Sequence, residues 1–221
     1  MLKLFGKYLL EPVNALTHLL GAVAALGGAL LLAYLTWGET GKMVSLVLYG
    51  LCMTFLYAAS TLLHGAKLSE MNRERLNRLD HAAIFLMIAG TYTPIIYNLF
   101  PDGWRWPTLV GYWLVALGGI LYKVFNSHIH NAFNKIIYPL LSWGGVVPAL
   151  LASREQMVVS IEGLALLLAG GLIYMAGFVV YYRQRPDPWP NVFGHHEIWH
   201  LFVLAGSFCH FLFMLFHIVP A

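Results

Sequence analysis

Residues 196–219 read His196-Glu-Ile-Trp-His200-Leu-Phe-Val-Leu-Ala-Gly-Ser-Phe-Cys-His210-Phe-Leu-Phe-Met-Leu-Phe-His217-Ile-Val219. Glu197 is the one acidic or basic side chain besides the histidines, so the run is apolar enough to cross a bilayer. A helix of about 20 such residues spans the ~30 Å hydrocarbon core. Helices are favoured there because they satisfy every backbone hydrogen bond within their own segment. The stretch predicts a transmembrane helix that begins with two histidines at i and i+4.

The rest of the chain has the same character. Of its 221 residues, 59% are hydrophobic and 10% are charged, and its mean hydropathy is +0.69. Soluble domains carry about 25% charged residues. With 196–219, the apolar stretches of spanning length lie at approximately 13–36, 44–66, 80–99, 106–125, 134–153 and 160–182. We therefore predict an all-α polytopic membrane protein: a single domain, residues 1–221, folded as a seven-transmembrane-helix bundle.

The basic residues predict its orientation. With a cytoplasmic N-terminus, ten of them fall on the cytoplasmic side: Lys3, Lys7, Lys67, Arg73, Arg75, Arg78, Lys123, Lys135, Arg183 and Arg185. The other side then holds three, Lys42, Arg105 and Arg154. This positive-inside bias predicts a multi-pass protein of the inner (plasma) membrane with its C-terminus outside. The net charge of +3 needs no nucleic-acid partner, because the basic residues lie in short loops beside anionic head groups.

Ionisable side chains from distant parts of the sequence converge near the cytoplasmic side. His64 closes the second predicted helix, Asp80 opens the third, and His196 and His200 open the seventh, while Ser60 lies one turn before His64. Three neutral imidazoles would bind Zn²⁺ and leave its fourth position to water, as in catalytic zinc sites. The Asp80 carboxylate would then orient that water or accept its proton, and Ser60 joins Asp80 as a candidate catalytic residue.

Each of these residues also has a structural interpretation when it is taken alone. His64 could be a hydrogen-bonded interfacial residue, Asp80 could be the N-cap of the third helix, and Ser60 could serve helix packing. Their shared depth in the membrane favours the metal site over these separate explanations, because costly intramembrane ionisable groups usually serve function.

At these positions the chain resembles the hemolysin III branch of the progestin and adipoQ receptor superfamily, which is related to adiponectin receptors and alkaline ceramidases. The similar motifs are Ser60-Thr-Leu-Leu-His64, Arg78-Leu-Asp80 and the His196 to His200 pair, and the likeness covers nearly the whole chain. The resemblance implies a three-histidine zinc site at His64, His196 and His200, with a water held by Asp80. Bacterial members are also similar in the segment Glu11-Pro-Val-Asn14-Ala-Leu-Thr-His18.

Glu11, Asn14 and His18 form one stripe of the first predicted helix, at i, i+3 and i+7. They lie on the cytoplasmic side and could either touch the zinc site or pin the first helix to its neighbours. The sequence leaves both interpretations open and favours packing.

The chemistry favours a zinc-dependent hydrolase of lipid amides or esters. The resemblance implies a ceramide-like or fatty-acyl membrane lipid as substrate and a link to membrane lipid homeostasis. One alternative is a lipid-responsive receptor or sensor in which zinc is structural and the lipid is a ligand. Another is a pore-forming cytolysin, a hemolysin. The pore has less support, because no predicted helix carries a polar stripe through the full depth of the membrane. The oligomeric state stays open.

The segment from His196 to His200 also satisfies the HExxH pattern of zinc proteases, in which Glu197 would be the general base. Intramembrane zinc proteases take an additional Asp ligand from another segment, and Asp102 in Phe100-Pro-Asp102-Gly103 is the candidate for that ligand. It falls in the loop after the third predicted helix, on the outer side, about a bilayer thickness of ~30 Å from His200. The predicted topology therefore disfavours intramembrane proteolysis.

Overall fold

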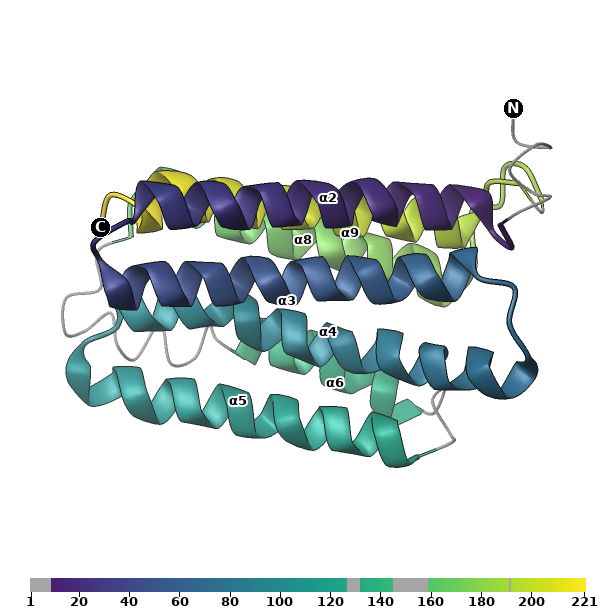
Figure 1. The fold of residues 1–221 in the computed structure, drawn as a ribbon, viewed down its shortest axis with the longest axis horizontal. Helices are drawn as coiled ribbons and strands as arrows, with labels where there is room; N and C mark the ends of the chain where they lie inside the picture. Colours follow the sequence, from purple (N-terminus) through teal and green to yellow (C-terminus); the bar gives the residue numbers. More distant parts are fainter. Residues whose placement is uncertain (1–8, 127–131, 145–158, 191) are drawn as a thin grey trace.

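The computed structural model describes residues 9–126, 132–144, 159–190 and 192–221, and these residues form long helices that run side by side (Figure 1). Six of the helical segments are long and apolar enough to cross a membrane. The chain is therefore an all-α polytopic membrane protein. In order, the elements are α2 (Pro12–Leu35), α3 (Thr40–Gly65), α4 (Glu70–Leu99), α5 (Asp102–Phe125), α6 (Ala132–Gly144), α8 (Ile161–Arg183), α9 (His195–Phe213) and the π-helix η2 (Met214–Ile218).

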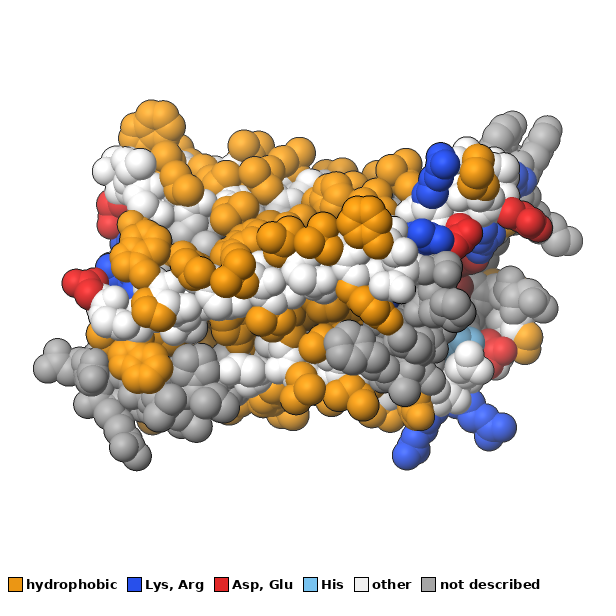
Figure 2. All heavy atoms as spheres, turned by 90° about the horizontal axis from the view of Figure 1, so that it is seen from below, with side chains coloured by type: hydrophobic (Ala, Val, Ile, Leu, Met, Phe, Trp, Pro, Cys, Tyr) orange, Lys and Arg blue, Asp and Glu red, His pale blue; other side chains and the backbone are white. Residues whose placement is uncertain are grey.

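The outer surface of the bundle is apolar. Leu20 and Leu30 of α2 are 70% and 66% exposed, and Leu114 of α5 and Leu172 of α8 are similarly exposed. Figure 2 shows hydrophobic side chains over the middle of one face and charged side chains gathered at its two ends. Patches of this kind are a liability in water but match the lipid that surrounds a transmembrane bundle.

Consecutive helices pack on one another along the chain, from α2 through α5, and α8 packs on α9. The first and last helices also meet, because α2 contacts α9. These contacts bring three helix ends together at one end of the bundle: the start of α2, the end of α3 and the start of α9 (Figure 1). The segments that carry the candidate ligands are thus adjacent in space although they are far apart in the sequence.

Most boundaries of the described helices lie close to the predicted ones. The predicted ranges 13–36 and 160–182 differ from α2 and α8 by one residue at each end. The predicted helix 134–153 is matched over α6, and its remainder lies outside the described residues.

One prediction was wrong: the helix expected at 80–99 begins at Glu70. Hydropathy reports only the apolar part of a helix, whereas the preceding segment is polar, lacks Gly and Pro, and carries an i,i+4 ion pair between Glu74 and Arg78. The helix therefore continues beyond the apolar region. Ser69 is its N-cap, so the interpretation of Asp80 as an N-cap is also wrong.

The proline-rich segment between α8 and α9 sets where α9 starts. Gln184 ends α8 in the left-handed conformation, with a φ of 52°, and α9 begins eleven residues further on, at His195. Prolines at 186, 188 and 190 prevent the helix from continuing between them. This connection places His196 and His200 in the first two turns of α9.

Candidate metal centre

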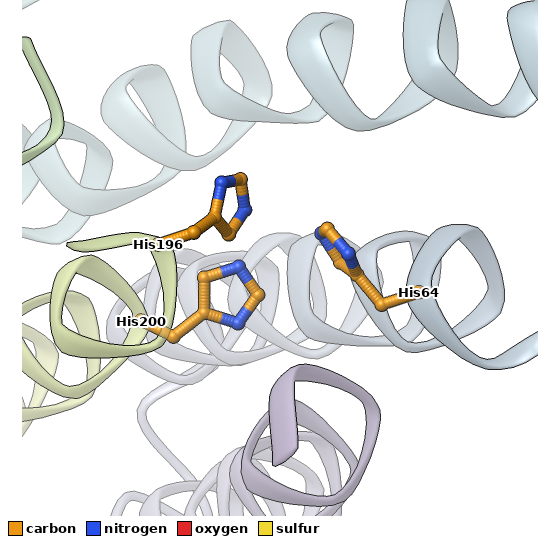
Figure 3. Close-up of side chains that lie close together, drawn as sticks. All are labelled: His64, His196 and His200. Carbon is orange, nitrogen blue, oxygen red and sulfur yellow. The ribbon is translucent and has the colours of Figure 1, made fainter. Parts of the chain in front are cut away.

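His64, His196 and His200 turn their rings toward one another (Figure 3). Each pair of ring centroids is 4.9 Å apart, and one nitrogen from each ring lies within 4.8 Å of the others. His64 and His200 are buried, whereas His196 is half-buried, so the cluster is more open on the His196 side. The helix geometry explains the pair on α9, because residues at i and i+4 share one face.

This donor set fits a tetrahedral metal ion. Zinc–nitrogen bonds of about 2.0 Å would hold the three nitrogens about 3.3 Å apart, so the rings need only close in slightly around an ion. The Nδ1 atom of His200 is buried and has no hydrogen-bond partner among the described residues. Three imidazoles without a carboxylate ligand are typical of zinc sites that keep one position open. The cluster could thus hold a metal ion.

His64 is oriented by a carboxylate. Its Nδ1 lies 2.6 Å from Oε2 of Glu11, the residue just before α2. Hydrogen bonding to His64 is the main cause that lowers the pKa of Glu11 to about 2, with help from Asn14. An ionised carboxylate only accepts hydrogen bonds, so Nδ1 of His64 carries a proton, and in the neutral ring Nε2 then keeps its lone pair. Partners of this kind fix the ring orientation of metal-binding histidines.

Asp80 lies in the interior of α4, with its carboxylate largely buried. The Ser60 hydroxyl and His64 are both near enough to act on this carboxylate. Ser60 is itself buried on α3, one turn before His64. The fold thus brings all five residues singled out in the sequence, from three helices, to one place: Ser60, His64, Asp80, His196 and His200.

Glu197 is engaged in hydrogen bonds at both of its oxygens. Oε2 accepts from the backbone N–H of Gly194, 2.8 Å away, and so satisfies the N-cap donor at the start of α9. Oε1 accepts from Nδ2 of Asn14, 2.9 Å away. Asp102 lies at the start of α5, at the opposite end of the bundle, where it pairs with Arg105 at 2.8 Å. The HExxH pattern therefore has a structural explanation in helix capping.

The stripe of α2 contacts the cluster directly. The His18 ring stacks on that of His200, with centroids 3.7 Å apart and planes 8° from parallel, and its edge meets the Tyr57 ring at 5.0 Å. Neither ring nitrogen of His18 has a hydrogen-bond partner in the described part of the chain. The packing interpretation of the stripe is thus incomplete, because Glu11 and His18 each touch a candidate ligand.

Two tyrosines near the site were not among the residues predicted from the sequence. The Tyr181 ring of α8 lies 5.7 Å from that of His196, and the Tyr138 hydroxyl of α6 donates to the His81 carbonyl at 3.0 Å. Both are near enough to Asp80 to be influenced by its charge. Tyr181 could have been noticed, because it precedes Arg183 at the cytoplasmic end of its predicted helix. Nothing in the local sequence distinguishes Tyr138.

A family model described as haemolysin-III related matches residues 7–211, a range that contains the three histidines and the α2 stripe. The chain is similar to hemolysin-3 of Bacillus cereus, with 33% identity over 95% of this chain and 92% of that protein. A hemolysin-3 homolog of Bacillus subtilis is 33% identical over 95% of this chain and 94% of its own length. The adiponectin receptor protein of Drosophila melanogaster is 27% identical over 91% of this chain and 49% of that protein.

Proposed function

The chain belongs to the haemolysin-III related family, and from this premise we propose that it is a zinc-dependent hydrolase of amide or ester bonds in membrane lipids. The observation that carries the proposal is a buried cluster of three imidazoles with the Asp80 carboxylate beside it. A zinc ion bound there would supply Lewis-acid polarisation of a carbonyl and a water of lowered pKa.

The protein's own residues account for the proton transfers. Asp80 accepts a proton from the attacking water as the water oxygen bonds to the acyl carbon. It then returns that proton to the leaving nitrogen or oxygen as the bond to the acyl carbon breaks. Ser60, whose hydroxyl lies near enough to act on the carboxylate, would hold it in place and is a positioning residue in this scheme.

The surroundings of the site favour a lipid substrate. His196 is the more accessible histidine of the cluster, the Tyr181 ring lies next to it, and the Trp199 ring lies next to that of Tyr181. Tyr and Trp combine an apolar body with a polar edge, which suits them to the region between head groups and acyl chains. A ceramide-like or fatty-acyl lipid would present its carbonyl at this depth and leave its chains in the apolar phase.

Metal analysis tests the proposal. We expect about one zinc per chain in detergent-purified protein, measured by mass spectrometry, because three neutral imidazoles suit this ion. His64→Ala and His200→Ala should each lose the ion, because two imidazoles bind it poorly. The matched control is His195→Ala, a neighbouring histidine outside the cluster, which should keep its zinc. Protein that lacks stoichiometric metal, or histidine variants that retain it, would contradict the hydrolase proposal.

A receptor or sensor with structural zinc is the second candidate. The observation that favours it is the extent of the packing around the cluster, where His18 stacks on His200 and Glu11 is bonded to His64. Contacts of this kind around the ligands are expected for a structural zinc ion that holds helices together. Under this alternative the purified protein binds zinc and lipid but does not hydrolyse the lipid. A direct assay of lipid hydrolysis therefore separates the two candidates.

A further inference from the structure

Glu11 holds His64 by two separate contacts. Its backbone N–H donates to the His64 carbonyl at 2.9 Å, and its carboxylate accepts from Nδ1 of the same residue at 2.6 Å. The first contact satisfies a carbonyl at the end of α3, where the helix itself supplies no donor. The carboxylate has two further donors, Nδ2 of Asn14 at 3.0 Å and a guanidinium nitrogen of Arg73 at 3.1 Å. Glu11 is thus held in place by several contacts, and it in turn orients the candidate ligand His64.

Asn14 extends this contact to the other ligand-bearing helix. Its side chain is 1% exposed, and its amide nitrogen donates both to Glu11 and to Oε1 of Glu197, at 3.0 and 2.9 Å. Glu197 lies between His196 and His200 in the sequence and caps α9 with its second oxygen. A primary amide has two N–H donors, so one Asn can serve two carboxylates. The result is a continuous chain of hydrogen bonds from His64 to the start of α9.

We propose that Glu11 and Asn14 are the positioning residues of the metal centre: Glu11 sets the tautomer of His64, and Asn14 fixes α3 relative to α9. This inference rests on the proposed zinc site. Because a carboxylate accepts and does not donate, it leaves Nε2 of His64 free to bind metal. The shared amide keeps the ligand-bearing ends of the two helices in register, so the three imidazoles converge before an ion arrives. None of these contacts takes part in the proposed proton transfers.

Zinc affinity tests the proposal through Glu11→Gln, which preserves the size of the side chain. A glutamine offers one acceptor oxygen to three donors and places an N–H₂ group among them. We expect the zinc dissociation constant of the purified protein to rise about 10- to 100-fold, the usual effect of losing such a partner. Competition for zinc with a chromophoric chelator measures this dissociation constant. Thr17→Ala is the matched control on α2, because Thr17 bonds only its own helix in the described structure, and it should stay within about twofold.

Further measurements separate positioning from general stability. Asn14→Ala keeps the bond between Glu11 and His64. We therefore expect the zinc dissociation constant to rise by about 3- to 10-fold, less than in Glu11→Gln. Glu11→Asp retains a carboxylate and should recover part of the lost affinity. The absorption spectrum of bound Co²⁺, which reports coordination geometry, should change in Glu11→Gln and not in Thr17→Ala. The melting temperature of the metal-free protein should also fall in Glu11→Gln, because buried donors lose their acceptor, so the Co²⁺ spectrum and the recovery in Glu11→Asp are the readouts of positioning.

The outcomes also distinguish this inference from the proposed function. Wild-type protein and Glu11→Gln that bind zinc equally tightly, within twofold, would overturn the positioning role and leave the hydrolase proposal standing. A Glu11→Gln variant with unchanged affinity but a lower melting temperature would show that the contacts only pin α2. Wild-type protein that binds no zinc would overturn the proposed function, and this inference with it.

Discussion

The proposed reaction depends on one ionised side chain beside the histidines, that of Asp80. Asp80→Asn preserves the shape of the side chain and removes the base. We expect lipid turnover to fall by about 10²- to 10⁴-fold, the usual contribution of general acid–base catalysis. Zinc content should stay at the wild-type level, because Asp80 is outside the ligand cluster. Initial rates with a fluorescent ceramide in mixed micelles, measured beside metal content, check both parts.

The matched control is Asp102→Asn at the opposite end of the bundle. Asp102 is exposed and pairs with Arg105, so this variant should keep its turnover within twofold. Turnover that survives Asp80→Asn would remove the general base from the mechanism. Loss of zinc in the same variant would make Asp80 a ligand instead.

The cluster was predictable from local spacing, and the contacts around it were not. His196 and His200 lie at i and i+4, as do Ser60 and His64, so each pair shares a helix face whatever the rest of the chain does. The bond between Glu11 and His64 depends instead on how α2 is rotated and on its approach to α3. Those quantities arise from packing between helices, which a single sequence does not report.

The approach of α2 to α3 depends on a glycine. A Cβ added at Gly50 of α3 would lie 2.5 Å from the Ala29 Cβ and 2.9 Å from its Cα on α2. Gly50→Ala must therefore push the helices apart, at a cost of about 1–3 kcal/mol. The better helix propensity of Ala offsets up to about 1 kcal/mol of it. We expect a lower melting temperature in detergent and weaker zinc binding, because α2 carries Glu11 and His18 to the cluster.

Gly27→Ala is the control on α2 itself. A Cβ at this position meets nothing within 4 Å among the described atoms, so the substitution should leave the melting temperature unchanged or raise it slightly. Equal melting temperatures and zinc affinities for Gly50→Ala and wild type would show that the contact between α2 and α3 is not needed to assemble the cluster.

Hydropathy predicted the helices best where lipid surrounds them. The ends of α2 and α8 are within one residue of the predicted ones, because polar residues begin where the membrane ends. The start of α4 was missed by ten residues, since a helix that continues into water is stabilised by propensity and i,i+4 pairs that hydropathy ignores. Consequently, Asp80 was assigned to a helix end although it lies well inside one.

In the part of the bundle that the structure describes, interior polar groups join neighbouring helices, which disfavours a pore through a single chain. Deep in the bundle, the Tyr57 hydroxyl donates to Oγ of Ser207 at 2.6 Å, and the Tyr174 hydroxyl lies 2.8 Å from the same atom. These contacts join α3, α8 and α9 across the interior. His210 of α9 and His217 of η2 lie against Gly170 and Gly163 of α8, where they fill the interface of α8 with α9 and η2. The polar groups of α9 therefore connect helices, as hydrogen-bonding side chains do in membranes.

The direction in which the bundle crosses the membrane decides which compartment the metal centre faces. Of the ten basic residues assigned to the cytoplasm in the sequence, the seven whose side chains the structure describes lie at the bundle end that holds the cluster, and this bias favours a cytoplasmic centre. We expect a cysteine at Asp102, which is exposed at the opposite end, to react with a membrane-impermeant maleimide on intact cells. The matched variant Glu70→Cys, at the exposed start of α4, should react only after permeabilisation.

Wild-type protein sets the background from Cys52 and Cys209, which lie within α3 and α9. The reverse pattern would place the centre on the outer face, and a hydrolase would then act on lipids of the other leaflet.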